Sequence, residues 1–155
     1  MVATYSTDHE RSCCERRLCD FDPDSGADAL VALDPAGSVN LLPIAAFRRF
    51  LAGFTPTVGT GGITAFSIVA APAVDTAVSS CTAVVTHALA SNPDAVTDYV
   101  FLECDADQIH EVLATATHVG VLVNLVTSTD EGKVFFERSE PLYGPRAGLT
   151  ADYIS

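Results

Sequence analysis

The stretch from Thr97 to Thr127, TDYVFLECDADQIHEVLATATHVGVLVNLVT, constrains the fold most, because it predicts strand, helix and strand in direct succession. Thr97–Cys104 is rich in aromatic and β-branched residues on both of its faces, which favours an inner strand. His118–Val126 alternates valine and leucine with smaller or polar residues, which is typical of a strand with one buried face.

A helix is expected between these two strands. The Asp105 carboxylate can accept the free N–H groups of a first helical turn, and Gln108 can reach back to close a capping box. An apolar stripe follows at helical spacing, formed by Ile109, Val112, Leu113 and Ala116. Roughly a dozen residues connect the strands, which is enough for a parallel crossover, although an antiparallel return is also open.

The remaining chain predicts further strands and one more helix. Ala29–Leu33 and Val39–Leu42 flank the turn residues Asp34-Pro35-Ala36-Gly37, which indicates a hairpin. Pro43 suits a first helical position, and the spacing of Ile44, Phe47, Leu51 and Phe54 predicts a helix that ends near Gly53. Thr55–Gly62 has the composition of a loop. Strands are expected at Ile63–Ala71, Cys81–Leu89 and Lys133–Arg138, the last returning from a hairpin turn at Ser128–Gly132.

These elements predict an α+β fold, with a mostly antiparallel sheet or sandwich of about seven strands and two short helices. The compact domain is expected over residues 29–140. Residues 1–28 are polar and without period, so they are interpreted as a flexible arm, and residues 141–155 as an irregular tail. With 155 residues, a single domain is expected.

Charge and hydropathy narrow the expected location and partners. Twenty acidic residues against eight basic ones give a formal charge of −12, which disfavours nucleic acid and suits a basic protein partner. No apolar run approaches the roughly 18 residues of a membrane span, and Asp8 and Glu10 precede any apolar run, so neither a membrane segment nor a signal peptide is expected. Assembly in the cytoplasm is therefore predicted.

Neither of two candidate metal sites has a convincing spacing. His9, Cys13, Cys14 and Cys19 offer zinc-type donors but lack a paired C-x2-C knuckle, and five cysteines in all make a disulfide framework unexpected. Asp20, Asp22 and Asp24 begin like a calcium loop, yet the bend position holds Ser25 and the twelfth position Val31. No metal, cofactor or catalytic residue is predicted. Whether the cysteines bind metal or cross-link stays open.

Several longer segments resemble small virion proteins of tailed bacteriophages, in particular head-decorating (cement) proteins. The segments are GGITAFSIVAA (61–71), TDYVFLECDADQI (97–109), ATHVGVLVNLVTSTDEGKVFF (116–136) and AGLTADYIS (147–155). The resemblance implies a non-enzymatic virion protein that staples the major capsid protein or other virion subunits and forms a homo-oligomer such as a trimer. The terminal segments would carry the contacts, through Arg11, Arg16, Arg17, Tyr143, Arg146, Leu149, Tyr153 and Ile154.

Two alternatives stay open. A head–tail connector or tail component would differ from a decoration protein only in ring symmetry and position. A small enzyme, or a ligand- or metal-binding domain, would use a pocket beside the predicted helix, with His110, Glu111 or Cys104 near it.

Overall fold

The computed structural model describes residues 14–21, 27–34, 37–58, 63–87, 98–125 and 131–141. These residues form nine strands, one α-helix and one 3-10 turn. The strands are β1 (Cys14–Phe21), β2 (Ala29–Leu30), β3 (Leu41–Pro43), β4 (Phe47–Val58), β5 (Ile63–Ala71), β6 (Thr82–Thr86), β7 (Val100–Asp105), β8 (His118–Leu125) and β9 (Glu131–Pro141). The helix is α2 (Ala106–Val112), and the 3-10 turn is η1 (Val78–Ser80).

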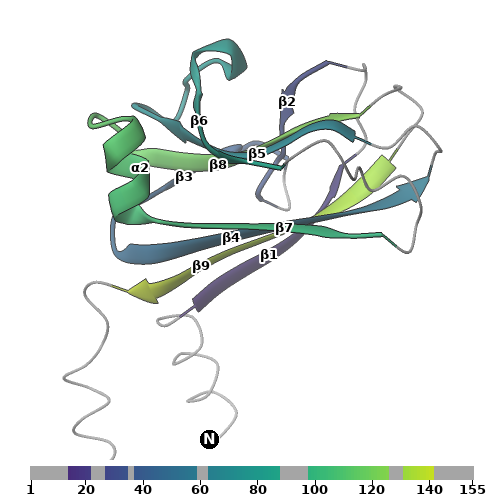
Figure 1. Cartoon of the computed structure of the whole chain (residues 1–155), viewed down its shortest axis with the longest axis horizontal. Coiled ribbons are helices and arrows are strands. Elements are labelled where there is room, and N and C mark those ends of the chain that lie inside the picture. Colours follow the sequence, from purple (N-terminus) through teal and green to yellow (C-terminus); the bar gives the residue numbers. More distant parts are fainter. Residues whose placement is uncertain are drawn as a thin grey trace, which may run out of the picture.

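The strands form two antiparallel sheets that face each other (Figure 1). One sheet has the order β1-β9-β4-β7; the other has the order β2-β8-β5-β6, with β3 also paired to β8. The first strand, β1, pairs with the last, β9. Inside this pair, β2 and β3 pair with β8, β4 pairs with β7, and β5 pairs with β6. This nested pairing is the topology of a jelly roll. The predicted mostly antiparallel β architecture is confirmed, with one described helix instead of two.

One hydrophobic core lies between the sheets. The inward residues of β4, which are Phe50, Ala52 and Phe54, are buried, as are Val119, Val121 and Val123 of β8. The ring centroids of Phe54 in β4 and Phe66 in β5 lie 5.9 Å apart, so aromatic packing joins the two sheets. Strand alternation therefore supplies the inner layer of each sheet.

The helix predicted from Pro43 to Gly53 is wrong. Pro43 ends β3, and Phe47–Val58 is the long strand β4, which also takes up the first half of the predicted loop Thr55–Gly62; residues 59–62 lie outside the described part. The residues Ile44, Phe47, Leu51 and Phe54 fit a helical period, but Phe50, Ala52 and Phe54 fit the strand period equally well. Pairing of β4 with both β7 and β9 decided between these periods, because it satisfies the backbone on both sides.

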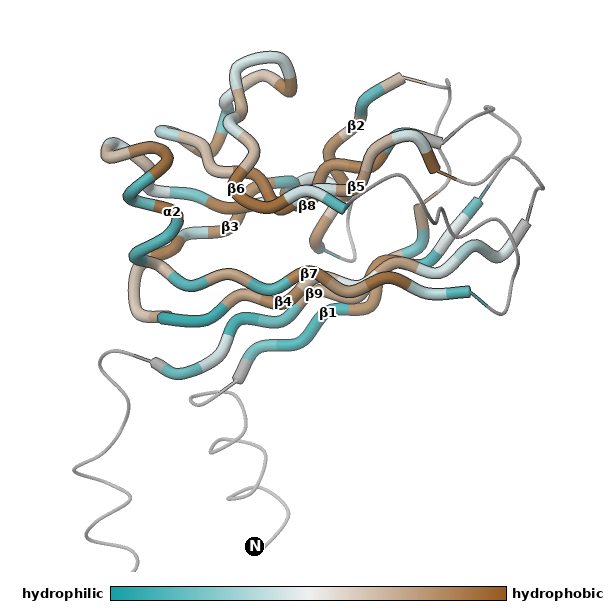
Figure 2. Tube along the Cα trace, in the orientation of Figure 1, coloured by the Kyte–Doolittle hydropathy of each residue, from teal (hydrophilic) through white to brown (hydrophobic). Residues whose placement is uncertain are grey.

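The predicted arm over residues 1–28 contains a strand. Cys14–Phe21 is β1, which pairs with β9 over its whole length. Figure 2 shows this strand as mostly hydrophilic. Of its inward positions, Phe21 is apolar, but Glu15 and Arg17 are charged. The apolar alternation that identifies a strand is therefore missing from its first half. Residues 1–13 and 22–26, and the predicted tail after Pro141, lie outside the described part.

The strand–helix–strand prediction for Thr97–Thr127 is confirmed in its elements. Asp105 caps α2: its carboxylate accepts the Gln108 N–H at 2.8 Å, and the Gln108 side chain accepts the Asp105 N–H at 2.9 Å. However, β7 and β8 belong to different sheets, so no parallel crossover exists between them. β7 is an edge strand with an exposed outer face, and the prediction of an inner strand is wrong.

Two predicted hairpins have other strand partners. The turn after Leu33 forms as expected, with the Gly37 N–H donating to Asp34 O at 3.0 Å, but β2 and β3 both pair with β8. The predicted strand at Lys133–Arg138 lies within β9, which pairs with β1 and β4 instead of β8. The predicted strands Ile63–Ala71 and Cys81–Leu89 correspond to β5 and β6, which do pair.

Replacing Ala46 by glycine is expected to stabilise the protein by up to about 1 kcal/mol. Ala46 lies in the β3–β4 turn, which the Phe47 N–H closes by donating to Ile44 O, and its φ is 76°. An L-residue with a Cβ is strained in this region, whereas glycine is not. Thermal unfolding should show a midpoint higher by about 2–4 °C. An unchanged or lower midpoint for Ala46→Gly would contradict this expectation.

Candidate interaction surfaces

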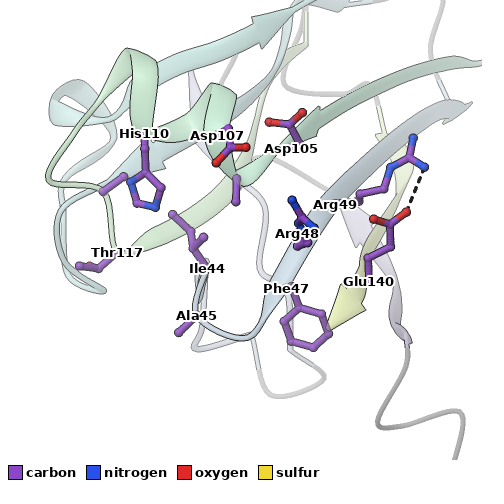
Figure 3. Close-up of a pocket in the computed structure, with 12 residues that line it drawn as sticks. Ile44, Ala45, Phe47, Arg48, Arg49, Asp105, Asp107, His110, Thr117 and Glu140 are labelled. Atoms are coloured by element: carbon purple, nitrogen blue, oxygen red, sulfur yellow. Dashed lines mark hydrogen bonds and ion pairs between the residues drawn. The ribbon is translucent and has the colours of Figure 1, made fainter. Parts of the chain in front are cut away.

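An open depression of about 780 Å³ lies at the end of the sandwich that carries α2 (Figure 3). Its walls come from the β3–β4 turn, the start of β4, the junction of β7 with α2, the segment before β8 and the end of β9. The lining residues are Ile44, Ala45, Phe47, Arg48, Arg49, Asp105, Ala106, Asp107, His110, Ala116, Thr117 and Glu140. Both charges and apolar side chains therefore face this space.

The capping box and one buried anchor place α2 over this depression. Ile109 is fully buried against the core, which leaves His110 and Asp107 facing outward. Arg49 donates to Glu140 at 3.2 Å and also pairs with Glu103. These pairs are exposed, so they add little stability.

Two arginines line the depression, and Arg48 is the one whose side chain is available to a ligand or partner. Its side chain is exposed, and it makes no hydrogen bond or ion pair with any residue of the described part. In Figure 3 it lies between the side chains of Asp107 and Asp105 on one side and Phe47 on the other. An exposed guanidinium with no partner among the described residues is a suitable contact for an acidic or aromatic group of a partner.

The structure does not assemble the alternative site of His110, Glu111 and Cys104. His110 lines the depression, whereas Glu111 is exposed on α2 and is not among the lining residues. The Cys104 side chain is buried in the core, and burial together with Asp105 and Glu103 raises its pKa to about 12. Its thiol is therefore protonated at neutral pH and cannot act as a thiolate nucleophile.

The proposed contact residues of the N-terminal segment are separated by the strand period of β1. Arg16 points outward and pairs with Glu137 at 2.8 Å. Arg17 points inward, where it pairs with Glu15 and donates to Leu33 O. The inward position of Arg17 leaves Arg16 as the more accessible of the two. Arg11, Tyr143, Arg146, Leu149, Tyr153 and Ile154 lie outside the described residues.

A partly buried ion cluster at the β1–β9 edge was not predicted from the sequence. Glu15 bridges Arg17 and Arg138, and Arg138 also donates to Pro43 O at 2.7 Å and lies 4.5 Å over the Phe47 ring. Arg138 is buried, and its Nε has no hydrogen-bond partner among the residues that the structure describes. Burial raises the pKa of Glu15, but hydrogen bonds and charges from Arg138 and Arg17 outweigh it, so the pKa is lowered. Glu15 and Arg17 are two residues apart, so in a strand they share one face, and this spacing was the only sequence signal for the ion cluster.

Within the described residues, no group of three or more His, Cys, Asp or Glu side chains could hold a metal ion. His9, Cys13, Asp22 and Asp24 lie outside that part, Cys14 and Cys19 lie in β1, and Asp20 pairs with Lys133 at 2.6 Å. Nor does any described helix have the length and hydropathy needed to cross a membrane.

The chain matches no known protein family model, and no curated protein is significantly similar to it.

Proposed function

We propose that this chain is a non-enzymatic virion protein of a tailed bacteriophage, which decorates the capsid and contacts neighbouring capsid subunits through its terminal segments. The observation that carries the proposal is that the described sandwich begins and ends at neighbouring strand positions. Cys14, the first residue of β1, lies opposite Ser139 near the end of β9. The chain therefore enters and leaves the described sandwich at neighbouring points.

The same end of the sandwich carries the depression. In the strand register Phe47 lies opposite Pro141, and Arg49 lies opposite both Ser139 and Asp105, so the end of β9 lies beside the depression that Arg48 lines. The segments that continue the chain from there, together with the exposed Arg48 and the partly buried Phe47, suit a contact with adjacent subunits of a larger assembly. The formal charge of −12 suits basic patches on such a partner.

The jelly-roll topology is compatible with this role but does not establish it. Jelly rolls form viral capsid domains and also lectin and cupin domains, so the surface has to support the function. A head–tail connector or tail component would use the same kind of surface. It would differ in where the chain sits on the particle.

We expect the tail residues to be needed for attachment to capsids. Virions from the culture that produces this chain would be stripped of it and mixed with full-length chain, and binding would be measured by co-sedimentation. Replacing Tyr143, Leu149 and Tyr153 by serine should weaken binding by about tenfold or more, because each removes apolar contact area. The matched control is Val74→Ser, which alters an exposed residue of the β5–η1 segment and should bind like the wild type.

Immunogold labelling decides between the virion roles. Regular labelling over the capsid surface supports decoration, and labelling only at the neck or tail would replace it by the connector or tail alternative. Equal binding of the triple variant and the wild type would show that the terminal contacts are wrong. Absence of the chain from virions would overturn the proposal as a whole.

A further inference from the structure

An apolar row crosses the outer face of the sheet β1-β9-β4-β7. In the strand register, Leu18 lies opposite Phe135, Phe135 opposite Gly53, and Gly53 opposite Phe101. Leu18 is 68% exposed and Phe101 55% exposed, although both are large apolar side chains. Directly opposite residues of an antiparallel pair point to the same face, so this row is continuous from one edge of the sheet to the other.

At the centre of the row, Gly53 has no side chain that would project between Phe135 and Phe101. The ring of Phe101 occupies the space that a Cβ on Gly53 would need, so the ring lies flat across β4. Tyr99, just before the start of β7, extends the same patch, with its ring centroid 5.6 Å from that of Phe101. A contiguous exposed patch of this kind usually marks an interaction site.

Charged pairs flank the row on both sides, at two residues' distance along the strands. On one side Lys133 donates to Asp20 at 2.6 Å, and on the other Arg16 donates to Glu137 at 2.8 Å. When both strands are followed in the direction of β9, the order in β1 is acid, leucine, base, whereas in β9 it is base, phenylalanine, acid. Rotation by 180° about the row therefore exchanges every one of these charges for its opposite.

We propose that this outer face binds a second copy of the chain about a two-fold axis that runs along the apolar row. The rotation places Asp20 across from Arg16 of the second copy. It also places Lys133 across from Glu137 of the second copy, and each contact occurs twice. Leu18, Phe135 and Phe101 meet their own counterparts in the middle. The interface is thus isologous, with two sheets packed face to face at roughly 10 Å.

The charge pattern also selects this axis over its main alternative. A two-fold axis parallel to the strands would place Lys133 across from Thr55 and Glu137 across from Leu51, which are uncharged. Of the four flanking charges only Arg16 would then meet an opposite charge, on Glu103, whereas all four do so about the axis along the row. A basic or acidic partner protein would meet two charges of each sign in the pairs that flank the row. The inference does not depend on the virion assignment, and it predicts a dimer contact where the sequence resemblance implied a trimer.

Sedimentation velocity on the full-length chain tests the surface. We expect a dimer at about 100 μM, and Leu18→Asp or Phe101→Asp should raise the dissociation constant by about a hundredfold or more, because each introduces a charge into an apolar contact. Val74→Asp is the matched control, since Val74 is 56% exposed but lies outside this face, and it should remain dimeric. Circular dichroism should show the same folded spectrum for all variants.

Charge exchange tests the axis. Lys133→Glu and Glu137→Lys should each weaken the dimer about tenfold, because like charges then meet across the interface. The double variant should recover the wild-type dissociation constant, since Glu at 133 then faces Lys at 137 of the second copy. Its thermal midpoint should stay lowered, because the pairs within each chain remain broken.

The proposal is overturned by several results. One is a wild-type chain that is monomeric at about 100 μM. This result would count against the dimer in each of three cases: an apolar row exposed to solvent, a row that binds a different partner, and a row covered by the chain's own terminal segment. Another is an oligomer of any size that survives Leu18→Asp, which would place its contact elsewhere. Equal dissociation by Val74→Asp, or failure of the double charge variant to recover dimerisation, would also contradict it.

Discussion

Glu15→Ala is expected to lower the free energy of unfolding by about 2–3 kcal/mol. Glu15 is the carboxylate that neutralises Arg138, whose side chain is only 9% exposed. Without it, a buried guanidinium keeps its charge and loses its ion pair, a change that costs about 3–5 kcal/mol when the pair is fully buried. The lower figure allows for the partial exposure of Glu15 itself. Urea unfolding followed by circular dichroism measures the change.

Removing the second partner should restore part of the loss. The double variant Glu15→Ala/Arg138→Met removes both charges and keeps an apolar chain over Phe47, so it should be more stable than Glu15→Ala alone. Glu137→Ala serves as the control, because its partner Arg16 is mostly exposed and the pair should contribute less than about 1 kcal/mol. Equal costs for Glu15→Ala and Glu137→Ala would show that burial does not strengthen the cluster.

The same cluster sets a pH dependence. The folded pKa of Glu15 lies below its ordinary value of 4.5, so the unfolded state binds the proton more readily. The stability from this pair is therefore complete above about pH 4.5 and is lost as the pH falls through the folded pKa. The difference in unfolding free energy between wild type and Glu15→Gln should shrink under acid and stay constant from pH 6 to about 8.

Phe66→Ala is expected to cost about 3–5 kcal/mol, the largest effect of a single side chain here. Phe66 is fully buried in β5, and its ring contacts Phe54 of the opposite sheet, so truncation opens a cavity between the sheets. If Phe66→Ala does not fold, Phe66→Leu keeps most of the volume and should cost about 1–2 kcal/mol. Urea unfolding gives both values.

A double-mutant cycle tests whether this contact joins the sheets. Phe54→Leu and Phe66→Leu should show a coupling energy of at least about 0.5 kcal/mol, as expected for residues in contact. Val74→Ala, at an exposed position, should be neutral within about 0.5 kcal/mol. Additive effects of the two phenylalanine substitutions would argue against direct packing between β4 and β5.

The candidate surfaces were mostly beyond sequence reasoning. Leu18, Phe135 and Phe101 form one row, yet they lie in three strands that are far apart in the chain, and only the pairing register brings them together. Leu18 also has charged residues on both sides in the sequence, and a single apolar side chain among them does not produce the alternation that predicts a strand. The position of His110 beside a pocket was anticipated, and Cys104 is buried on the same face of β7 as Val100 and Leu102, as expected for a small apolar strand residue.

By itself, the sequence determined where several strands run and how α2 begins. Val119, Val121 and Val123 must share one face, and Asp105 can cap a helix only at that point, because both patterns depend on neighbours a few residues away. Only the tertiary structure decided that Phe47–Val58 is a strand, that Cys14–Phe21 is one as well, and that β7 and β8 lie in opposite sheets. The physical reason is that a strand forms its hydrogen bonds with the backbone of segments distant in the sequence. The local pattern of apolar residues does not show which segments these are.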